Sequence, residues 1–170
     1  MINLKVYHGS TFIVEKPNLE RLNYRTDFGK GFYTTTDIEQ AKKWAKIKLE
    51  RIKKNEDTSL NIYKYINIYE YIENSNLDVL NFETATKEWL NFVFENRQSH
   101  TLIHKYDIVI GPVANDNLYQ VLINYENGVY DVDEAIKRLK TYVLSNQISF
   151  HTEKSLESLK YIETRKLEEE

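Results

Sequence analysis

The sequence lacks cysteine altogether, and only two prolines and five glycines occur among its 170 residues. Without cysteine the chain can form neither a disulfide framework nor a thiolate zinc site, and it has no cysteine nucleophile. The scarcity of proline and glycine excludes collagen-like repeats and long disordered linkers. No apolar run approaches the roughly 20 residues that a membrane-spanning helix needs. Residues 1–6 lack the basic-then-apolar layout of a secretory signal.

The residues that are present describe a single globular domain. Apolar residues make up 41% of the chain and charged residues 29%, which suits one substantial core at this length. The net charge of −3 argues against a protein that simply coats nucleic acid. We therefore expect one domain over residues 1–170, a charged tail at about 163–170 and a cytoplasmic location.

Hydrophobic periodicity predicts strands and helices that alternate without a regular βαβ repeat, which favours an α+β fold. Strands are expected at 4–8, 31–35, 61–65, 78–82, 106–110 (ended by Gly111-Pro112) and 147–151. Helices are expected from 36, at 86–97, around 118–125 with Gly128 as a stop, from 131 with Ile136, Leu139 and Val143 buried, and briefly after the last strand. At the first helix, Thr36 and Glu39 have the spacing of a capping box.

Several local patterns have both a functional and a plain structural explanation. Asp27-Phe28-Gly29 spells the magnesium triplet of protein kinases, but the chain is too short for a kinase and has no upstream glycine-rich loop. His100 and His104 lie four residues apart, as metal ligands on one helix do, but without a third ligand we favour solvent exposure or packing as their explanation. The lysines of the first helix are explained by a solvated face or by phosphate contacts.

Three separated motifs carry more information together than singly. They are Tyr7-His8-Gly9-Ser10 at the end of the first strand, Phe28-Gly29-Lys30-Gly31-Phe32-Tyr33 entering the second, and Asn146-Gln147-Ile148-Ser149-Phe150 in the last. Each alone has a structural explanation, such as a hydrogen-bonded histidine or a tight glycine turn.

In this order the motifs resemble the histidine–tyrosine class of ADP-ribosyltransferases, the class of diphtheria toxin and the poly(ADP-ribose) polymerases. Those proteins carry His-Gly-Ser or His-Gly-Thr on the first strand, and the polymerases carry Phe-Gly-Lys-Gly-(Ile/Val)-Tyr on the second. The sequence is also similar to an uncharacterised bacterial branch of this fold, often encoded beside small antitoxin-like proteins. The resemblance covers most of the chain and implies a split mixed or antiparallel β-sheet flanked by helices.

The resemblance implies that NAD is the substrate and assigns a role to each motif residue. His8, Tyr33 and Gln147 stand at the catalytic positions. His8 is expected to hydrogen-bond a ribose hydroxyl, and Gly9 to pair through its backbone with the nicotinamide amide. Tyr33 and Trp44, eleven residues apart as in the family, would hold the nicotinamide ring between them, an aromatic–cation contact worth about 0.5–2 kcal/mol.

The remaining site residues have secondary roles under the same resemblance. Ser10, Lys30 and Gly31 are assigned to cofactor contacts, with Ser10 and Lys30 reaching ribose or phosphate. Arg25 either reaches a phosphate or lies at the surface. Trp44 either stacks on the ring or packs in the core, since it lies near the apolar stripe of its helix. No metal is implied.

Gln147 departs from the family pattern, in which a glutamate opens this strand. An amide orients a hydroxyl but supplies no full charge, and losing such an electrostatic group commonly costs about 3–4 kcal/mol. Chain elongation is therefore not expected, whereas single ADP-ribose transfer is. Asp116 either supplies a carboxylate from a neighbouring loop or caps a helix.

Three functions follow as hypotheses. The first is a mono-ADP-ribosyltransferase, a bacterial toxin-like effector that modifies an unidentified macromolecule and pairs with a small antitoxin-like protein. The second is a non-catalytic module that binds NAD or ADP-ribose. The third is a structural interaction protein in which the motifs only hold turns and strands together.

Overall fold

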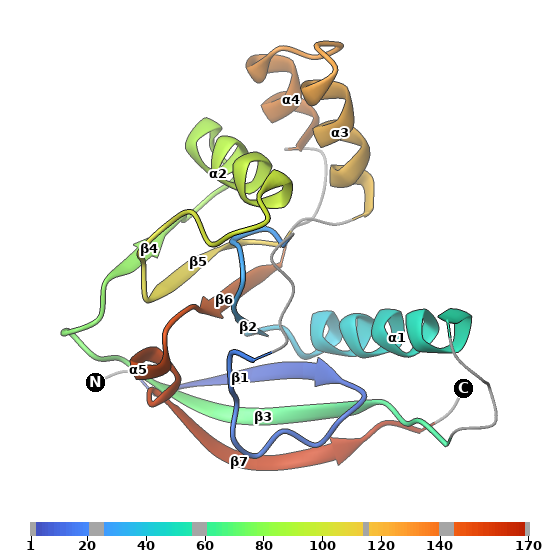
Figure 1. Cartoon of the computed structure of the whole chain (residues 1–170), viewed down its shortest axis with the longest axis vertical. Helices are drawn as coiled ribbons and strands as arrows, with labels where there is room; N and C mark the ends of the chain where they lie inside the picture. Colours follow the sequence, from blue (N-terminus) through green and yellow to red (C-terminus); the bar gives the residue numbers. More distant parts are fainter. Residues whose placement is uncertain (1–2, 21–25, 56–60, 114–115, 140–144, 169–170) are drawn as a thin grey trace.

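A computed structural model describes residues 3–20, 26–55, 61–113, 116–139 and 145–168. Within these ranges the chain is an α+β protein with seven strands and five helices (Figure 1). The strands are β1 (Asn3–Ser10), β2 (Phe32–Thr35), β3 (Tyr65–Ile72), β4 (Val79–Asn81), β5 (Ile108–Pro112), β6 (Asn146–Phe150) and β7 (Leu159–Lys166). The helices are α1 (Ile38–Asn55), α2 (Lys87–Gln98), α3 (Asp116–Glu126), α4 (Val132–Leu139) and α5 (Glu153–Leu156). The α+β class predicted from the sequence is confirmed.

The seven strands form one mixed, mostly antiparallel sheet in the order β4-β5-β6-β2-β1-β3-β7. Only β4 and β5 run parallel; the other described neighbours are antiparallel. The joint between β1 and β2 rests on a single register pair, Tyr7 with Thr35, whereas β1 and β3 pair along their whole length. The sheet therefore has its shortest strand pairing at its centre, between β1 and β2, where the first two sequence motifs meet.

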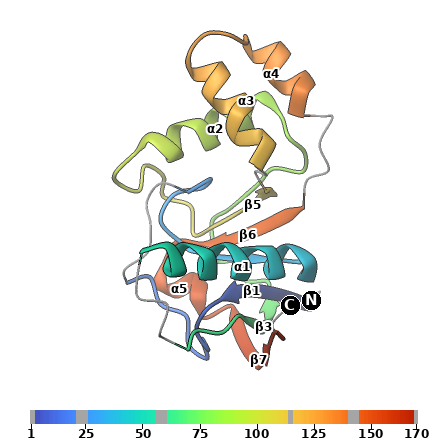
Figure 2. The same cartoon turned by 90° about the vertical axis from the view of Figure 1, so that its right-hand side faces the viewer.

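Helices cover the two halves of the sheet separately. In both views α1 lies along the half made by β1 and β3, while α2, α3 and α4 gather beside β4 and β5 (Figures 1 and 2). Ala41 of α1 packs on Ile66 and Ile68 of β3. At the other end, Trp89 of α2 packs in a cluster with Phe28 and Val109. The strands and loops between these halves hold the predicted site residues.

The opposite face of β1 and β3 is closed by aromatic residues. Tyr69 and Tyr71 of β3 pack with Val6, Phe32 and the inward residues of β6. Alternate residues of β3 are thus buried on both faces, against α1 on one side and this cluster on the other. For this reason Tyr65–Ile72 shows little polar alternation, and the strand expected at 61–65 lies further along the chain than its pattern predicted.

The residues that cap the helices agree with the predicted starts of α2 and α4 but not with that of α1. Thr86 caps α2 through Trp89 N, and Asp131 caps α4 through Glu134 N. At α1, however, the capping side chain belongs to Asp37, whose Oδ1 accepts from Glu39 N at 3.0 Å. The capping box predicted for Thr36 is therefore wrong.

Gly128 follows α3 with a positive φ of 75°, the left-handed conformation that suits glycine after a helix. Ile136 of α4 packs against the cluster around Trp89. The side chain of Leu139 and all of Val143 lie outside the described residues.

Two strand boundaries also differ from the predictions. β5 continues through Gly111 and Pro112 instead of stopping before them, because Pro112 is the last residue of the strand and its missing N–H breaks no later pair. The strand β7 was not predicted, and it takes in residues 163–166 of the segment assigned to a charged tail. In the described ranges no helix has both the length and the apolar character to cross a membrane.

Candidate functional site

The His8 side chain bridges the weakly paired joint between β1 and β2. Its Nδ1 lies 2.7 Å from the carbonyl oxygen of Tyr33. Because a carbonyl only accepts, Nδ1 must carry the proton, and Nε2 of the neutral ring is left as an acceptor. Burial, and then the charge of Lys48, hold the pKa of His8 well below its usual value, so the ring is neutral at pH 7. Among the described residues none donates to Nε2.

The His8 and Tyr33 rings do not face each other. The His8 ring stacks on Phe32, with centroids 4.1 Å apart. The Tyr33 ring lies 6.4 Å from that of Phe28 and 6.3 Å from that of His151. Consecutive residues of a strand point to opposite faces, so Phe32 and Tyr33 diverge. His8 and Tyr33 are thus joined through the Tyr33 backbone and not through their rings.

Gly9 is buried beneath α1. A Cβ at this position would lie 1.8 Å from the carbonyl oxygen of Ala41, so only glycine permits the helix to approach this closely. The carbonyl oxygen of Gly9, expected to meet a nicotinamide amide, accepts a hydrogen bond of 2.7 Å from Lys48 Nζ. Burial lowers the pKa of Lys48 to about 8, and the charge of Arg51 adds to this effect.

Trp44 lies half-buried on the same helix. No ring contact joins it to Tyr33 within the described part of the chain. Trp44 is thus part of the helix that covers Gly9, but in the described residues its ring does not pair with that of Tyr33.

The Tyr33 hydroxyl is anchored by the loop that precedes β2. Phe28 N donates to it at 2.9 Å, and it lies 2.8 Å from Thr26 Oγ1 and 2.6 Å from the carbonyl oxygen of Gly29. Gly29 has a positive φ of 87°, which turns the loop back toward the ring. Burial raises the pKa of Tyr33 far above its usual value, so the phenol stays neutral and acts through its hydrogen bonds.

Gln147 lies on the Tyr33 face of the sheet, joined to a buried ion pair. Its Nε2 donates to Asp27 Oδ2 at 2.9 Å and to the carbonyl oxygen of Pro112 at 3.2 Å. The other carboxylate oxygen of Asp27 accepts from Arg97 Nε at 2.8 Å and from Arg97 Nη2. Gln147 is 2% exposed and Asp27 7%. The loop 26–29 therefore holds both Tyr33 and Gln147.

The other predicted contact residues have mainly local partners. Ser10 Oγ accepts from Phe12 N at 3.2 Å and so supports the turn after β1. Gly31 lies against β6, where a Cβ would come within 2.7 Å of His151 Nδ1 and 2.8 Å of the carbonyl oxygen of Phe150. The carbonyl oxygen of Lys30 bonds to His151 Nδ1 at 2.7 Å.

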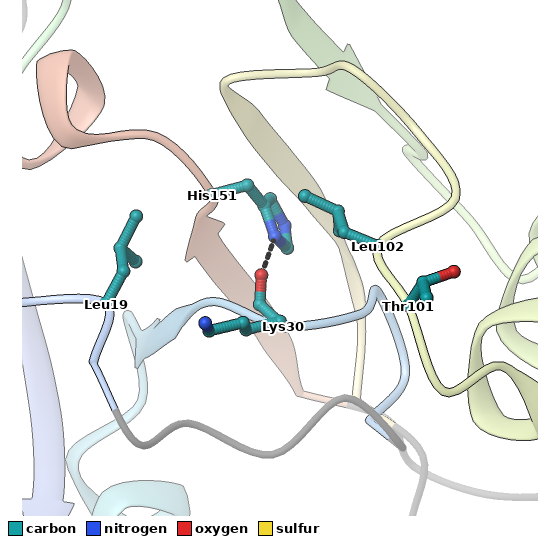
Figure 3. A pocket seen from close by; sticks show the side chains of 5 residues that line it. All are labelled: Leu19, Lys30, Thr101, Leu102 and His151. Atoms are coloured by element: carbon teal, nitrogen blue, oxygen red, sulfur yellow. Dashed lines mark hydrogen bonds between the residues drawn. The ribbon is translucent and has the colours of Figure 1, made fainter.

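A pocket of about 290 Å³ lies beside this last contact (Figure 3). Its lining residues are Leu19, Lys30, Thr101, Leu102 and His151. Lys30 is thus the one predicted site residue among them. His151 is held on both nitrogens, since Nε2 lies 2.7 Å from Ser149 Oγ, and burial lowers its pKa to about 4.

The structure adds four polar residues that the sequence analysis did not assign to the site. Asp27 was set aside with the kinase-like triplet, and Arg97 comes from a helix 70 positions further along the chain. Lys48 had a readable signal, because it follows Ala41 by seven residues and shares its helix face. His151 directly follows the third motif.

The roles expected for Arg25 and Asp116 lie outside the described side chains, and the shared helix face considered for His100 and His104 is not formed. Arg25 lies outside the described residues, and Asp116 is the first residue of α3, with a side chain that is likewise not described. His100 and His104 do not share a helix, because α2 ends at Gln98 and His104 Nε2 instead lies 2.7 Å from the carbonyl oxygen of Phe28. The described ranges contain no group of three or more acidic or histidine side chains that could hold a metal.

Comparison with known proteins places this α+β chain in a family defined by sequence. Residues 4–161 match the family described as "Protein of unknown function (DUF3990)". The chain belongs to this family. Searches of the curated proteins and of the solved structures gave no match.

Proposed function

We propose that this protein is an NAD-dependent mono-ADP-ribosyltransferase, a bacterial toxin-like effector that acts on a macromolecule. In the reaction, a nucleophile of the acceptor bonds to C1′ of the nicotinamide ribose. The bond between C1′ and the nicotinamide nitrogen breaks, its electron pair leaves with neutral nicotinamide, and the acceptor's proton passes to solvent. The transition state resembles an oxocarbenium ion, so geometry and nearby charge decide the rate.

The hydrogen bond between His8 Nδ1 and the carbonyl oxygen of Tyr33 is the observation that carries the proposal. It sets the tautomer of His8 and leaves Nε2 as an acceptor for a ribose hydroxyl. The same bond joins the end of β1, which includes Gly9, to β2, and these two strands otherwise share a single register pair. A ligand that contacts both strand ends would thus lie across this joint.

Gln147 supplies the second polar contact in the proposal. It lies on the Tyr33 face of the sheet, whereas the His8 ring lies on the Phe32 face, so the dinucleotide would reach both across the weakly paired joint between β1 and β2. Both of its N–H groups are used by acceptors of the protein, so its Oε1 is the atom that would accept from a second ligand hydroxyl. Because the amide is neutral, it orients without adding negative charge, which favours slow single transfer over chain growth.

A second candidate function is non-catalytic binding of NAD or ADP-ribose. It is favoured by the same residue, because Gln147 is 2% exposed, carries no charge and is held by the buried Asp27. In this case His8 and Gln147 would bind the dinucleotide, and nicotinamide would not be released.

Incubation with NAD labelled in the nicotinamide and adenine parts separates these functions. A transferase releases free nicotinamide and labels a macromolecule when cell lysate is added. A binding module shows a higher melting temperature with NAD but releases no nicotinamide over hours. If NAD and ADP-ribose both leave the melting temperature unchanged, both functions are excluded and the motifs have only structural roles.

The variant His8→Asn makes this experiment specific to Nε2. The asparagine amide keeps a donor near the place of Nδ1, and so near the carbonyl oxygen of Tyr33, while Nε2 is removed. We expect the melting temperature without ligand to change little, and NAD stabilisation and nicotinamide release to be lost. His100→Asn, an exposed histidine of the same chain, is the matched control and should behave as the unmodified protein. NAD binding that survives His8→Asn would contradict the assigned role.

A further inference from the structure

The carboxylate of Asp27 is held on both of its oxygens. Oδ1 accepts from the Arg97 guanidinium, and Oδ2 accepts from Gln147 Nε2 at 2.9 Å. These partners come from α2 and β6, so Asp27 connects the loop before β2 to both elements. Its side chain is nine-tenths buried, where such charge-assisted hydrogen bonds are stronger than at the surface.

The partners of Gln147 determine which way its amide points. Asp27 Oδ2 and the carbonyl oxygen of Pro112 can only accept, so both must face the Nε2 end of the amide. The reverse orientation would bring Oε1 against a carboxylate oxygen in a buried site, at a cost comparable to an unpaired buried polar group. Oε1 is thus turned away from Asp27, and no described residue donates to it.

We propose that Asp27 is a positioning residue, which fixes the Gln147 amide so that Oε1 is presented as an acceptor to a hydroxyl of the bound dinucleotide. The proposal rests on the proposed function, since the hydroxyl is that of the nicotinamide ribose of NAD. Asp27 itself does not touch the ligand. Its carboxylate acts through Gln147 and is neutralised by Arg97.

A charge at position 147 has a specific consequence under this arrangement. Replacing Gln147 by glutamate places a carboxylate against Asp27 Oδ2 and the carbonyl oxygen of Pro112, with no proton to donate. Two carboxylates in contact cannot both ionise in a buried site, so Gln147→Glu alone is expected to be less stable and no faster. The simple expectation from the family, that glutamate here raises turnover, holds only when Asp27 is also changed.

The pair Asp27→Asn with Gln147→Glu restores the arrangement with the charge exchanged. The asparagine Nδ2 takes the place of Oδ2 and donates to the new carboxylate, while Oδ1 still accepts from Arg97. The net charge of the three side chains is unchanged and the hydrogen bond between positions 27 and 147 is kept, whereas the bond to the carbonyl oxygen of Pro112 is lost. The double variant therefore tests the contact itself, because the two changes should compensate each other.

The experiment compares four proteins: the unmodified chain, Asp27→Asn, Gln147→Glu and the double variant. We expect each single change to lower the melting temperature by about 5–10 °C, and the double variant to lose clearly less than the sum of the two single losses, although the lost bond to Pro112 keeps it below the unmodified chain. The deficit of Gln147→Glu should shrink as the pH falls from 7 to 5, because its carboxyl then takes up a proton. A double variant whose loss equals the sum of the two single losses would overturn the proposal.

A ligand readout distinguishes this proposal from the proposed function. Asp27→Asn should reduce the melting shift produced by NAD, whereas Asp107→Asn should not. Asp107 is a matched control, a buried carboxylate that accepts from Thr152 Oγ1 and pairs with Lys154. If nicotinamide is released, the double variant should release it at least about tenfold faster than Gln147→Glu.

The two failures are separable. A normal NAD shift in Asp27→Asn overturns the positioning role while leaving the proposed function intact. Compensation in the double variant without any NAD shift in the unmodified chain overturns the proposed function, and with it the ligand named here.

Discussion

Replacing Gly9 by alanine is the sharpest test of how α1 sits on the sheet. The new Cβ would lie 1.8 Å from the carbonyl oxygen of Ala41, 2.8 Å from its carbonyl carbon and 2.9 Å from Ala45 N. All three are backbone atoms, so no side chain can rotate away. To reach an ordinary contact of 3.4 Å the helix has to retreat by about 1.6 Å, which opens its packing on Ile66 and Ile68.

Overpacking of this kind costs about 1–3 kcal/mol and more where the backbone must move, so we expect a loss of at least about 3 kcal/mol. For a chain of this size that corresponds to a melting temperature lower by about 6–12 °C, measured by far-ultraviolet circular dichroism. Gly128→Ala is the control, because its Cβ meets no atom within 4 Å and only the positive φ is strained. That strain costs about 1–2 kcal/mol.

If Gly9→Ala melts no lower than Gly128→Ala, the close seating of α1 on β1 is refuted. The result also bears on function. Loss of NAD binding in Gly9→Ala would follow from a displaced helix, so it is no measure of a contact between Gly9 and the ligand. His8→Asn, which spares the helix, is the better test of binding.

Three further predictions concern single side chains. Burial lowers the pKa of Lys48 to about 8, while the unfolded chain keeps this proton to about 10.5. The free energy of unfolding in urea should therefore rise between pH 8 and 10, and Lys48→Met should abolish this rise. The same variant should bind NAD more tightly, because the carbonyl oxygen of Gly9 no longer accepts from Lys48. Burial lowers the pKa of His151 to about 4, so the free energy of unfolding should fall as the pH drops from 6.5 toward 4. The fall should be smaller in His151→Gln, and an equal dependence of unfolding free energy on pH in the two proteins would contradict this. Tyr33→Phe leaves the N–H of Phe28 without its acceptor and should cost about 1–3 kcal/mol of unfolding free energy; an unchanged value in urea would count against the anchoring role.

Much of the architecture was readable from local patterns. The first strand, the second strand and α1 follow from alternation, a glycine pair and helical spacing, which are properties of adjacent residues. The cap of α1 was misplaced by one residue because Thr36 and Asp37 are both good capping residues, and only the backbone course decides between them. Strand β3 was misplaced because both of its faces are buried.

The polar network of the site was not readable in the same way. Asp27, Arg97 and Gln147 meet from a loop, a helix and a late strand, and no spacing in the sequence links them. The motif around Tyr33 predicted the importance of that residue through its ring. In the structure the carbonyl oxygen and the hydroxyl of Tyr33 make the decisive bonds, which depend on the turn at Gly29.

Strand β7, eight residues long, ends the strand order of the sheet, and its outer edge pairs with no other described strand. Its exposed side chains include Lys160, Glu163, Arg165 and Lys166. A strand of a second chain that paired with this edge would have to desolvate these charged side chains, which opposes fibril growth and self-association at β7. The same charged composition that made the segment look like a tail therefore keeps an open β-edge from aggregating.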